Sequence, residues 1–192
     1  SRTLLKKVVT TLGLYTSVSQ KRVFGYDMPL YKKSPISVFM TPGEAEELYA
    51  PVELDLSYTT DKKLSVKATY TLDEESDEET MRQDFDKFPA VLTTPVGIIS
   101  FMVNDSIPVE EDVDLKAYIN SPVAVAKSYG TNLTVEPTSK TTTIAKLSVQ
   151  NTDRARAMDF INCLVALYNQ DANDEKNEVA EKTAEFIEER LL

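Results

Sequence analysis

The amino-acid sequence predicts an α+β fold in which helices at both ends of the chain flank a β-rich middle. Residues 2–15 place leucines and valines at helical spacing, and residues 153–192 contain neither glycine nor proline. Between them, residues 34–112 hold several short strand-like stretches that are separated by turn signals. We therefore expect a discontinuous α/β base domain, formed by residues 1–33 and 113–192. An antiparallel β-rich domain, sandwich or jelly-roll-like, is inserted into it at residues 34–112.

The composition is that of a folded protein, and it removes several classes of function. The chain has 192 residues, of which 42% are apolar and 27% charged, as is usual for a globular protein. The net charge of 21 − 31 = −10 argues against nucleic-acid binding through the field of the whole protein. Histidine is absent, which excludes Ser-His-Asp and Cys-His catalytic arrangements and histidine zinc sites. Cys163 is the only cysteine, and we predict a small core residue there rather than a reactive thiol.

The elements of the N-terminal half follow from local spacing. The first helix is expected to end near Gly13. Residues 52–58 and 64–72 alternate strictly between apolar and polar side chains, which predicts two half-buried strands joined by a hairpin-like turn. Tyr58 and Tyr70 fall on the apolar faces of these strands and are predicted to be core residues. Two further apolar stretches, at residues 35–40 and 96–103, are also predicted to be strands.

After Pro108 the pattern changes to a strand, a short helix, two strands and a long helix. The predicted strands cover residues 113–119, 133–136 and 142–149. The short helix is expected to have Ser121 at its N-cap, Pro122 in its first turn and Gly130 past its end. Thr152 or Asp153 is expected to cap the last helix, and the first helix is expected to pack back onto this unit.

Residues 73–80 contain six acidic side chains in eight residues. Clustered carboxylates are the ligands that Ca²⁺ prefers, but the spacing matches no EF-hand loop and no glycine is present at its turn. We therefore interpret the stretch as a solvated loop rather than a calcium site.

The last helix changes character along its length. Its first half carries a broad apolar stripe, predicted to face the core, made of Met158, Ile161, Leu164, Val165, Leu167, Tyr168 and Ala172. Its second half keeps only a narrow apolar seam, made of Val179, Ala180, Thr183, Phe186, Ile187 and Leu191. From Asp171 onward there are eight acidic residues and three basic ones. We expect this half to leave its own domain, to continue past residue 192 and to pair with another helix. The alternative is a fully docked helix whose polar half lies on the surface.

Several stretches together resemble the chain-length determinant family, the Wzz-like polysaccharide co-polymerases. They are residues 1–9, 34–38, 133–143, 151–157 and, most clearly, 168–191, which begins Tyr-Asn-Gln-Asp-Ala and ends Phe-Ile-Glu-Glu-Arg-Leu. Their order and spacing carry the resemblance, which covers nearly the whole chain and is least specific between residues 41 and 112. The nearest resemblance is to large members, which often continue into a cytoplasmic tyrosine autokinase.

The resemblance implies a function, a location and partners. Proteins of this family are anchored in the inner membrane by a helix at each end and place an α/β base domain in the periplasm. From that domain they extend a coiled-coil region. They form homo-oligomers and regulate the chain length and export of capsular or exopolysaccharide. The implied partners are the polysaccharide polymerase, the outer-membrane export machinery and the glycan. Membrane contact would be made only by the flanking helices, and no nucleic-acid partner or cofactor is expected.

The residues expected to matter are those that could join protomers. They are Arg154, Arg156, Val179, Thr183, Phe186, Ile187 and Arg190. The arginines could pair with the acidic excess of a neighbouring protomer, but ordinary solvated arginines are an equally good interpretation for any one of them.

We expect no catalytic site in this chain. Its five glycines are isolated and form no phosphate-binding loop, so kinase activity is not assigned to these residues. Two other classes stay open: a carbohydrate-binding β module at residues 34–112 and, less favoured, a hydrolase.

Overall fold

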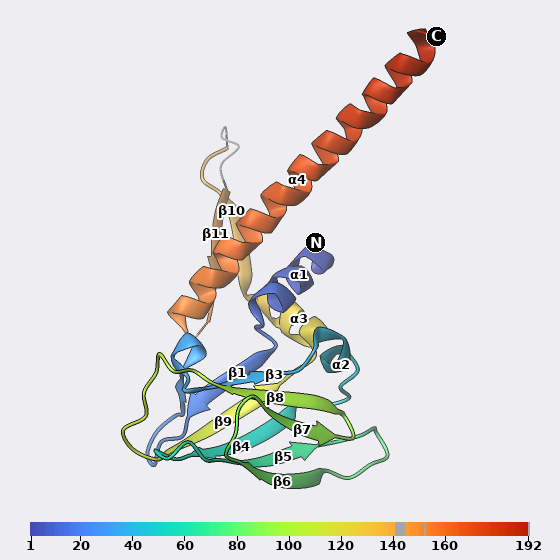
Figure 1. Cartoon of the computed structure of the whole chain (residues 1–192). Helices are drawn as coiled ribbons and strands as arrows, with labels where there is room; N and C mark the ends of the chain where they lie inside the picture. Colours follow the sequence, from blue (N-terminus) through green and yellow to red (C-terminus); the bar gives the residue numbers. More distant parts are fainter. Residues whose placement is uncertain (141–144, 152, 192) are drawn as a thin grey trace.

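The computed structural model describes residues 1–140, 145–151 and 153–191, and it shows a mixed α and β fold with antiparallel sheets and a long C-terminal helix (Figure 1). The helices are α1 (Arg2–Leu12), η1 (Tyr31–Lys33, a 3₁₀ turn), α2 (Pro42–Glu46), α3 (Pro122–Asn132) and α4 (Arg154–Leu191). The strands are β1 (Thr16–Gln20), β2 (Met28–Pro29), β3 (Ile36–Phe39), β4 (Val52–Tyr58), β5 (Leu64–Tyr70), β6 (Glu79–Phe85), β7 (Ala90–Thr94), β8 (Gly97–Val103), β9 (Val113–Ile119), β10 (Leu133–Pro137) and β11 (Ala145–Val149).

The strands form two sheets and a separate hairpin. The larger sheet has the order β2-β1-β9-β4-β5-β6, the smaller has the order β3-β8-β7, and β10 pairs with β11. All of these pairings are antiparallel. The larger sheet joins strands from both sides of the predicted boundary at residue 112, because β9 lies between β1 and β4.

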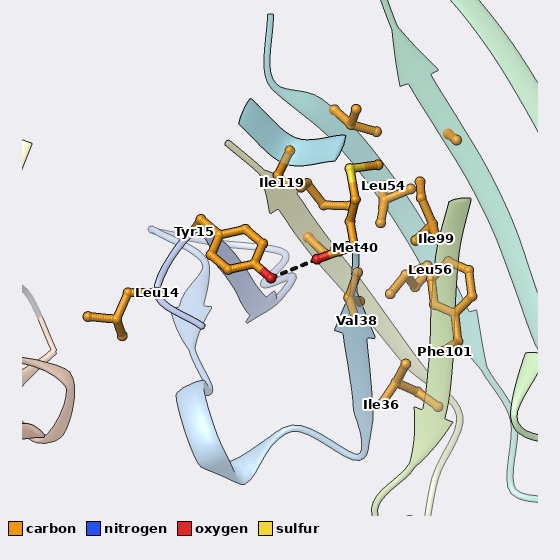
Figure 2. Close-up of a cluster of buried hydrophobic side chains, with 14 of the residues drawn as sticks. Leu14, Tyr15, Ile36, Val38, Met40, Leu54, Leu56, Ile99, Phe101 and Ile119 are labelled. Carbon is orange, nitrogen blue, oxygen red and sulfur yellow. Dashed lines mark hydrogen bonds between the residues drawn. The ribbon is translucent and has the colours of Figure 1, made fainter. Parts of the chain in front are cut away.

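The core lies between the two sheets, where the apolar faces of alternating strands meet. Figure 2 shows Ile36 and Val38 of β3 and Phe101 of β8 facing Leu54 and Leu56 of β4, and these side chains are almost completely buried. The strict alternation of β4 and β5 produces this inner face, and Tyr58 and Tyr70 belong to it as predicted, with exposed fractions of 3% and 4%.

The helices cover one end of this sandwich (Figure 1). Helix α1 packs against both α3 and α4. This confirms the prediction that the first helix packs onto the unit formed by the C-terminal part of the chain. Helix α1 stops at Leu12 because Gly13 adopts the left-handed conformation, with φ 66°, that closes many helices. Tyr15, in the turn that follows, is buried and donates a 2.6 Å hydrogen bond from its hydroxyl to the carbonyl oxygen of Met40, which ties this turn to the end of β3 (Figure 2).

Other sequence predictions are confirmed in part. The strands predicted at residues 35–40, 96–103, 113–119 and 133–136 are present within one or two residues, whereas β1, β2, β6 and β7 were not predicted. The strand predicted at residues 142–149 is described from Ala145, since residues 141–144 lie outside the described chain. Strand β6 begins inside the acidic stretch, so residues 79–80 are strand rather than loop.

The predicted buried stripe of the last helix is confirmed only in part: Leu164 is buried, and Ile161 and Leu167 pack against the core. Met158, Val165 and Tyr168 are 50%, 40% and 63% exposed, and the buried side chains of α4 are Phe160 and Leu164. The first half of α4 carries apolar residues on more than one side, so helical spacing alone did not show which side faces the core.

Candidate oligomer interface

The root of α4 is held by side chains from distant parts of the chain. Asp153 caps the helix, because its Oδ1 accepts a 3.1 Å hydrogen bond from the backbone N–H of Arg156. This confirms one of the two predicted caps; the other, Thr152, lies outside the described residues. The ring of Phe160 stacks on that of Tyr129 in α3, with 4.3 Å between the ring centroids, so the first two turns of α4 are fixed against α3.

Arg156 is committed to contacts within its own chain. Its guanidinium donates to the hydroxyl of Tyr129 at 2.9 Å and to the carbonyl oxygens of Thr16, at 3.3 Å, and Leu14. It also lies 5.8 Å from the ring centroid of Tyr31. Five-donor guanidinium groups suit such multiple contacts, and this one links α4 to α3 and to the turn between α1 and β1.

Asp159 forms a second link at the root of α4. Its Oδ2 accepts a 2.6 Å hydrogen bond from the hydroxyl of Tyr31 and lies 2.8 Å from Nζ of Lys32. The hydrogen bonds from Lys32 and Tyr31 hold the pKa of the Asp159 carboxyl below its usual value. Burial, together with the bond to Asp159, raises the pKa of the Tyr31 hydroxyl. Tyr31 has φ 44°, an uncommon conformation for a non-glycine residue.

Arg154 is placed differently from Arg156. It is exposed and lines a hollow of about 400 Å³ between residues 29–33 and the first turn of α4. No ion pair of Arg154 is present within the described parts of the chain. Arg154 is therefore available to an outside partner, whereas Arg156 is used to build the fold.

The distal half of α4, residues 173–191, projects away from the rest of the molecule, and all of its residues are exposed (Figure 1). Val179, Phe186 and Ile187 are 64%, 54% and 52% exposed, so the predicted apolar seam is open. The predicted overhang is therefore present, and the fully docked alternative does not describe this helix. An apolar stripe on an otherwise charged helix is typical of a surface that pairs with another helix.

Among the described residues, the side-chain contacts of the distal half are local to the helix. The Thr183 hydroxyl donates to the carbonyl oxygen of Val179 at 2.7 Å, which satisfies it without an outside partner. The guanidinium of Arg190 lies 4.6 Å from the ring centroid of Phe186, and Lys182 pairs with Glu178 at 2.5 Å. The structure thus brings Val179, Thr183, Phe186, Ile187 and Arg190 together on one projecting segment, and Arg154 and Arg156 at its root.

Two other predicted features can be placed. Cys163 packs against the core but is only partly buried, and burial followed by the nearby charge of Asp159 raises the pKa of its thiol. In the acidic stretch, Asp73 accepts hydrogen bonds from the Ser76 hydroxyl at 2.7 Å and from the backbone N–H of Glu75 at 3.0 Å, which closes a local turn.

The described residues contain no group of three or more Asp, Glu, Cys or His side chains placed to hold a metal ion. None of the helices, over the residues that could be searched, combines the length and apolarity needed to cross a membrane. The cluster of Tyr31, Tyr129 and Asp159 at the root of α4 was missed by sequence reasoning. These residues lie as many as 128 positions apart, and no local pattern links them.

A scan against protein-family models and a search of curated proteins both find no match for this chain.

Proposed function

We propose that this chain is the periplasmic part of an inner-membrane polysaccharide co-polymerase. In that role it acts as an oligomeric scaffold that regulates the chain length and export of capsular or exopolysaccharide. The observation that carries the proposal is the projecting half of α4, whose exposed apolar seam is of the kind that a partner helix would cover. The sequence motifs between residues 168 and 191, which resemble the chain-length determinant family, lie on this same segment.

The root of α4 supports a scaffold rather than a catalytic role. The hydrogen bonds of Arg156 and Asp159 fix the first turns of α4 to η1, to α3 and to the turn after α1. The helix therefore leaves the rest of the domain in a defined direction. The proposal assigns no reaction to this chain, and a tyrosine autokinase, if the whole protein has one, lies in another part of it.

We also propose that the chain is a discontinuous base domain, residues 1–33 and 113–192, into which residues 34–112 are inserted. In its support, β2, β1 and β9 are consecutive in the larger sheet, and the strands β4, β5 and β6 extend that sheet on the other side of β9. Helices α1, α3 and α4 pack together from the two ends of the chain. The inserted strands would then continue the sheet of the base domain.

The test of the scaffold is a double variant, Phe186→Ala with Ile187→Ala, placed in the full-length gene of the organism that encodes it. We expect a changed distribution of polysaccharide lengths on a gel and a smaller cross-linked oligomer in membranes, because the seam loses its two largest apolar side chains. The matched control, Glu181→Ala with Glu188→Ala, alters exposed residues of the same segment and should leave both unchanged. Unaltered glycan length together with unaltered oligomer size in the seam variant would refute the proposal.

A carbohydrate-binding β module is a second candidate, favoured by one observation. The outer face of the larger sheet carries a shallow hollow of about 230 Å³ lined by Ser57, Ser65, Lys67, Arg82 and Asp84, an arrangement of donors and acceptors that suits sugar hydroxyls. Calorimetric titration of the chain with the native polysaccharide would detect such binding. Arg82→Ala should then abolish it.

A further inference from the structure

The outer face of the larger sheet carries its charged side chains in rows that cross the strands. One row follows the register of the sheet from Lys116 on β9 through Asp55 on β4 and Lys67 on β5 to Arg82 on β6. Side chains that oppose each other directly on neighbouring strands have Cβ atoms about 4.5–5.5 Å apart, so each member of the row can reach its neighbours. This row contains three cations and one carboxylate.

The carboxylate of the row is already occupied from its β9 side. Asp55 Oδ1 lies 2.9 Å from Nζ of Lys116 and 2.5 Å from Nζ of Lys21, which follows β1. Over the described part of the chain, neither Lys67 nor Arg82 forms an ion pair or a side-chain hydrogen bond. Two like charges therefore face each other on β5 and β6 without a counter-ion.

This pair of like charges points to a bound anion. Like charges that are directly opposed on neighbouring strands destabilise a sheet. Departures from such local rules are expected at functional sites, where a ligand can supply the missing interaction. Guanidinium groups bind carboxylates through two parallel N–H bonds, and an ammonium beside the guanidinium adds a third donor.

The rest of the hollow of about 230 Å³ on this face specifies what else the ligand carries. Its lining includes Ser65 and Asp84, which oppose each other two residues along the strands from Lys67 and Arg82, about 7 Å away. The lining also includes Asp114, whose Oδ1 accepts a 2.6 Å hydrogen bond from the Ser57 hydroxyl. Carboxylates and a serine hydroxyl at this distance suit the hydroxyl groups of a sugar ring.

We infer that this hollow binds a sugar residue that bears one carboxylate, a uronic acid unit of a polysaccharide. The carboxylate lies between Lys67 and Arg82, and the ring hydroxyls donate to Asp84 and Asp114. The inference rests on the carbohydrate-binding function proposed above as the second candidate, and it names the class of sugar. It does not depend on the scaffold function.

Other ligands satisfy only part of this lining. A neutral sugar would leave Lys67 and Arg82 facing each other without an anion. A dianion such as phosphate would bring a second negative charge close to Asp84. An acidic side chain of another protein would pair with the two cations but would bring no hydroxyl groups to the neighbouring carboxylates.

The first test compares two forms of one glycan by calorimetric titration. They are the polysaccharide of the organism that encodes the chain and the same material after its carboxylates have been reduced to alcohols. We expect the reduction to weaken binding about tenfold or more, because the ligand loses hydrogen bonds to charged groups. Lys67→Gln with Arg82→Gln should weaken binding of the native form to the same degree and should leave binding of the reduced form unchanged.

The matched control is Arg2→Gln with Lys127→Gln. It removes one arginine and one lysine charge at exposed positions outside the hollow, so it should leave the affinity for both forms unchanged. Equal weakening by the control and by the Lys67 and Arg82 variant would mean that general electrostatic attraction drives binding, and it would overturn the inference.

The second test needs no glycan. Arg82→Glu replaces a repulsion with an attraction to Lys67, so it should raise the thermal unfolding midpoint of the free chain by about 1–3 °C while abolishing binding. Lys87→Glu makes the same charge change at an exposed residue outside the hollow and should give no such rise. A midpoint for Arg82→Glu at or below that of the wild-type chain would show that Lys67 and Arg82 do not repel each other, and it would remove the basis of the inference.

The outcomes separate this inference from the proposed functions. If both forms of the glycan bind equally well, or if Lys67→Gln with Arg82→Gln binds as the wild-type chain does, carbohydrate binding stands and the uronic acid site is wrong. If neither form binds, both are refuted. The effect of Phe186→Ala with Ile187→Ala on glycan length tests the scaffold alone, since these residues lie on α4 and not in the hollow.

Discussion

Arg156 and Asp159 are the two residues that decide how α4 leaves the body. They lie about one turn apart on the helix, and their partners come from η1, from α3 and from the turn after α1. A partly buried guanidinium that satisfies two carbonyl oxygens and a tyrosine hydroxyl is costly to remove, because its acceptors lose their donors.

We expect Arg156→Ala to lower the free energy of unfolding by about 1–3 kcal/mol. Arg156→Lys should be nearly as destabilising, since a single ammonium cannot replace the branched guanidinium. Urea unfolding followed by tyrosine fluorescence measures the change. Arg154→Ala is the matched control and should stay within about 0.5 kcal/mol of wild type. Equal losses in Arg154→Ala and Arg156→Ala would contradict the anchoring role.

The lowered pKa of the Asp159 carboxyl predicts that the free energy of unfolding depends on pH. Because Lys32 and Tyr31 depress the folded-state pKa of this carboxyl, its contribution is present above the unfolded value of roughly 3.9 and is lost as pH falls through the folded-state pKa. Asp159→Asn should therefore destabilise the protein at neutral pH, and the difference from wild type should shrink below about pH 4. Unfolding measured at a series of pH values checks this. A difference that does not vary with pH would exclude the ionic contribution.

At the scale of elements, α1 and α3 come close together at Gly130. A side chain at this position would meet Leu5, whereas one at Gly43 would meet nothing within 4 Å. Both glycines lie in helices, and neither has positive φ. The prediction that Gly130 lies past the end of its helix is therefore wrong, because α3 continues to Asn132.

Gly130→Val should destabilise the protein by about 1–3 kcal/mol through overpacking of α1 against α3. Gly43→Val makes the same change in open space and should have a much smaller effect. Thermal unfolding followed by circular dichroism compares the two. If Gly130→Val matched Gly43→Val, the approach of the two helices would not depend on the missing side chain.

The elements that could be predicted from sequence are those whose burial alternates cleanly. Val52–Tyr58 is buried at every second residue, and its predicted bounds are those of β4. Strand β6 has no buried residue, because it lies at the edge of the larger sheet, and its acidic start resembles a loop. Residues 16–20 are all half-buried and show no alternation, so β1 was missed as well.

The residues of the candidate interface also divide into some that could be predicted from the sequence and some that could not. The projecting seam could be predicted, since a helix segment that packs on no other described element shows its whole pattern in one stretch of sequence. The buried side of the first half of α4 could be predicted only in part, at Leu164, because it depends on where α1 and α3 lie. Phe160 is buried by stacking on Tyr129, a residue 31 positions away.

At the scale of the whole molecule, the body and the distal half of α4 are separate in their contributions to stability. The body has a core between two sheets and under α1, α3 and the first half of α4, whereas residues 173–191 are exposed throughout. Segments with little buried apolar area add little to global unfolding free energy.

A chain shortened to end at Ala172 should therefore unfold within about 0.5 kcal/mol of the full chain, measured at a concentration where both are monomeric. Its helical signal in circular dichroism should fall, because half of α4 is removed. A large loss of stability would mean that the distal half contributes to the folded body.

Because α4 is one uninterrupted helix, a small change in its tilt at the root produces a large displacement of its far end. From Phe160, where it is clamped, to Leu191 the helix is about 46 Å long, so a tilt of about 10° at the root would move the tip by about 8 Å. A substitution that loosens Arg156 or Asp159 would thus change where the seam points without altering the seam itself. In the oligomer proposed above, errors in the angle between neighbouring copies would accumulate around a closed assembly, and the contacts of Arg156 and Asp159 would keep that angle constant.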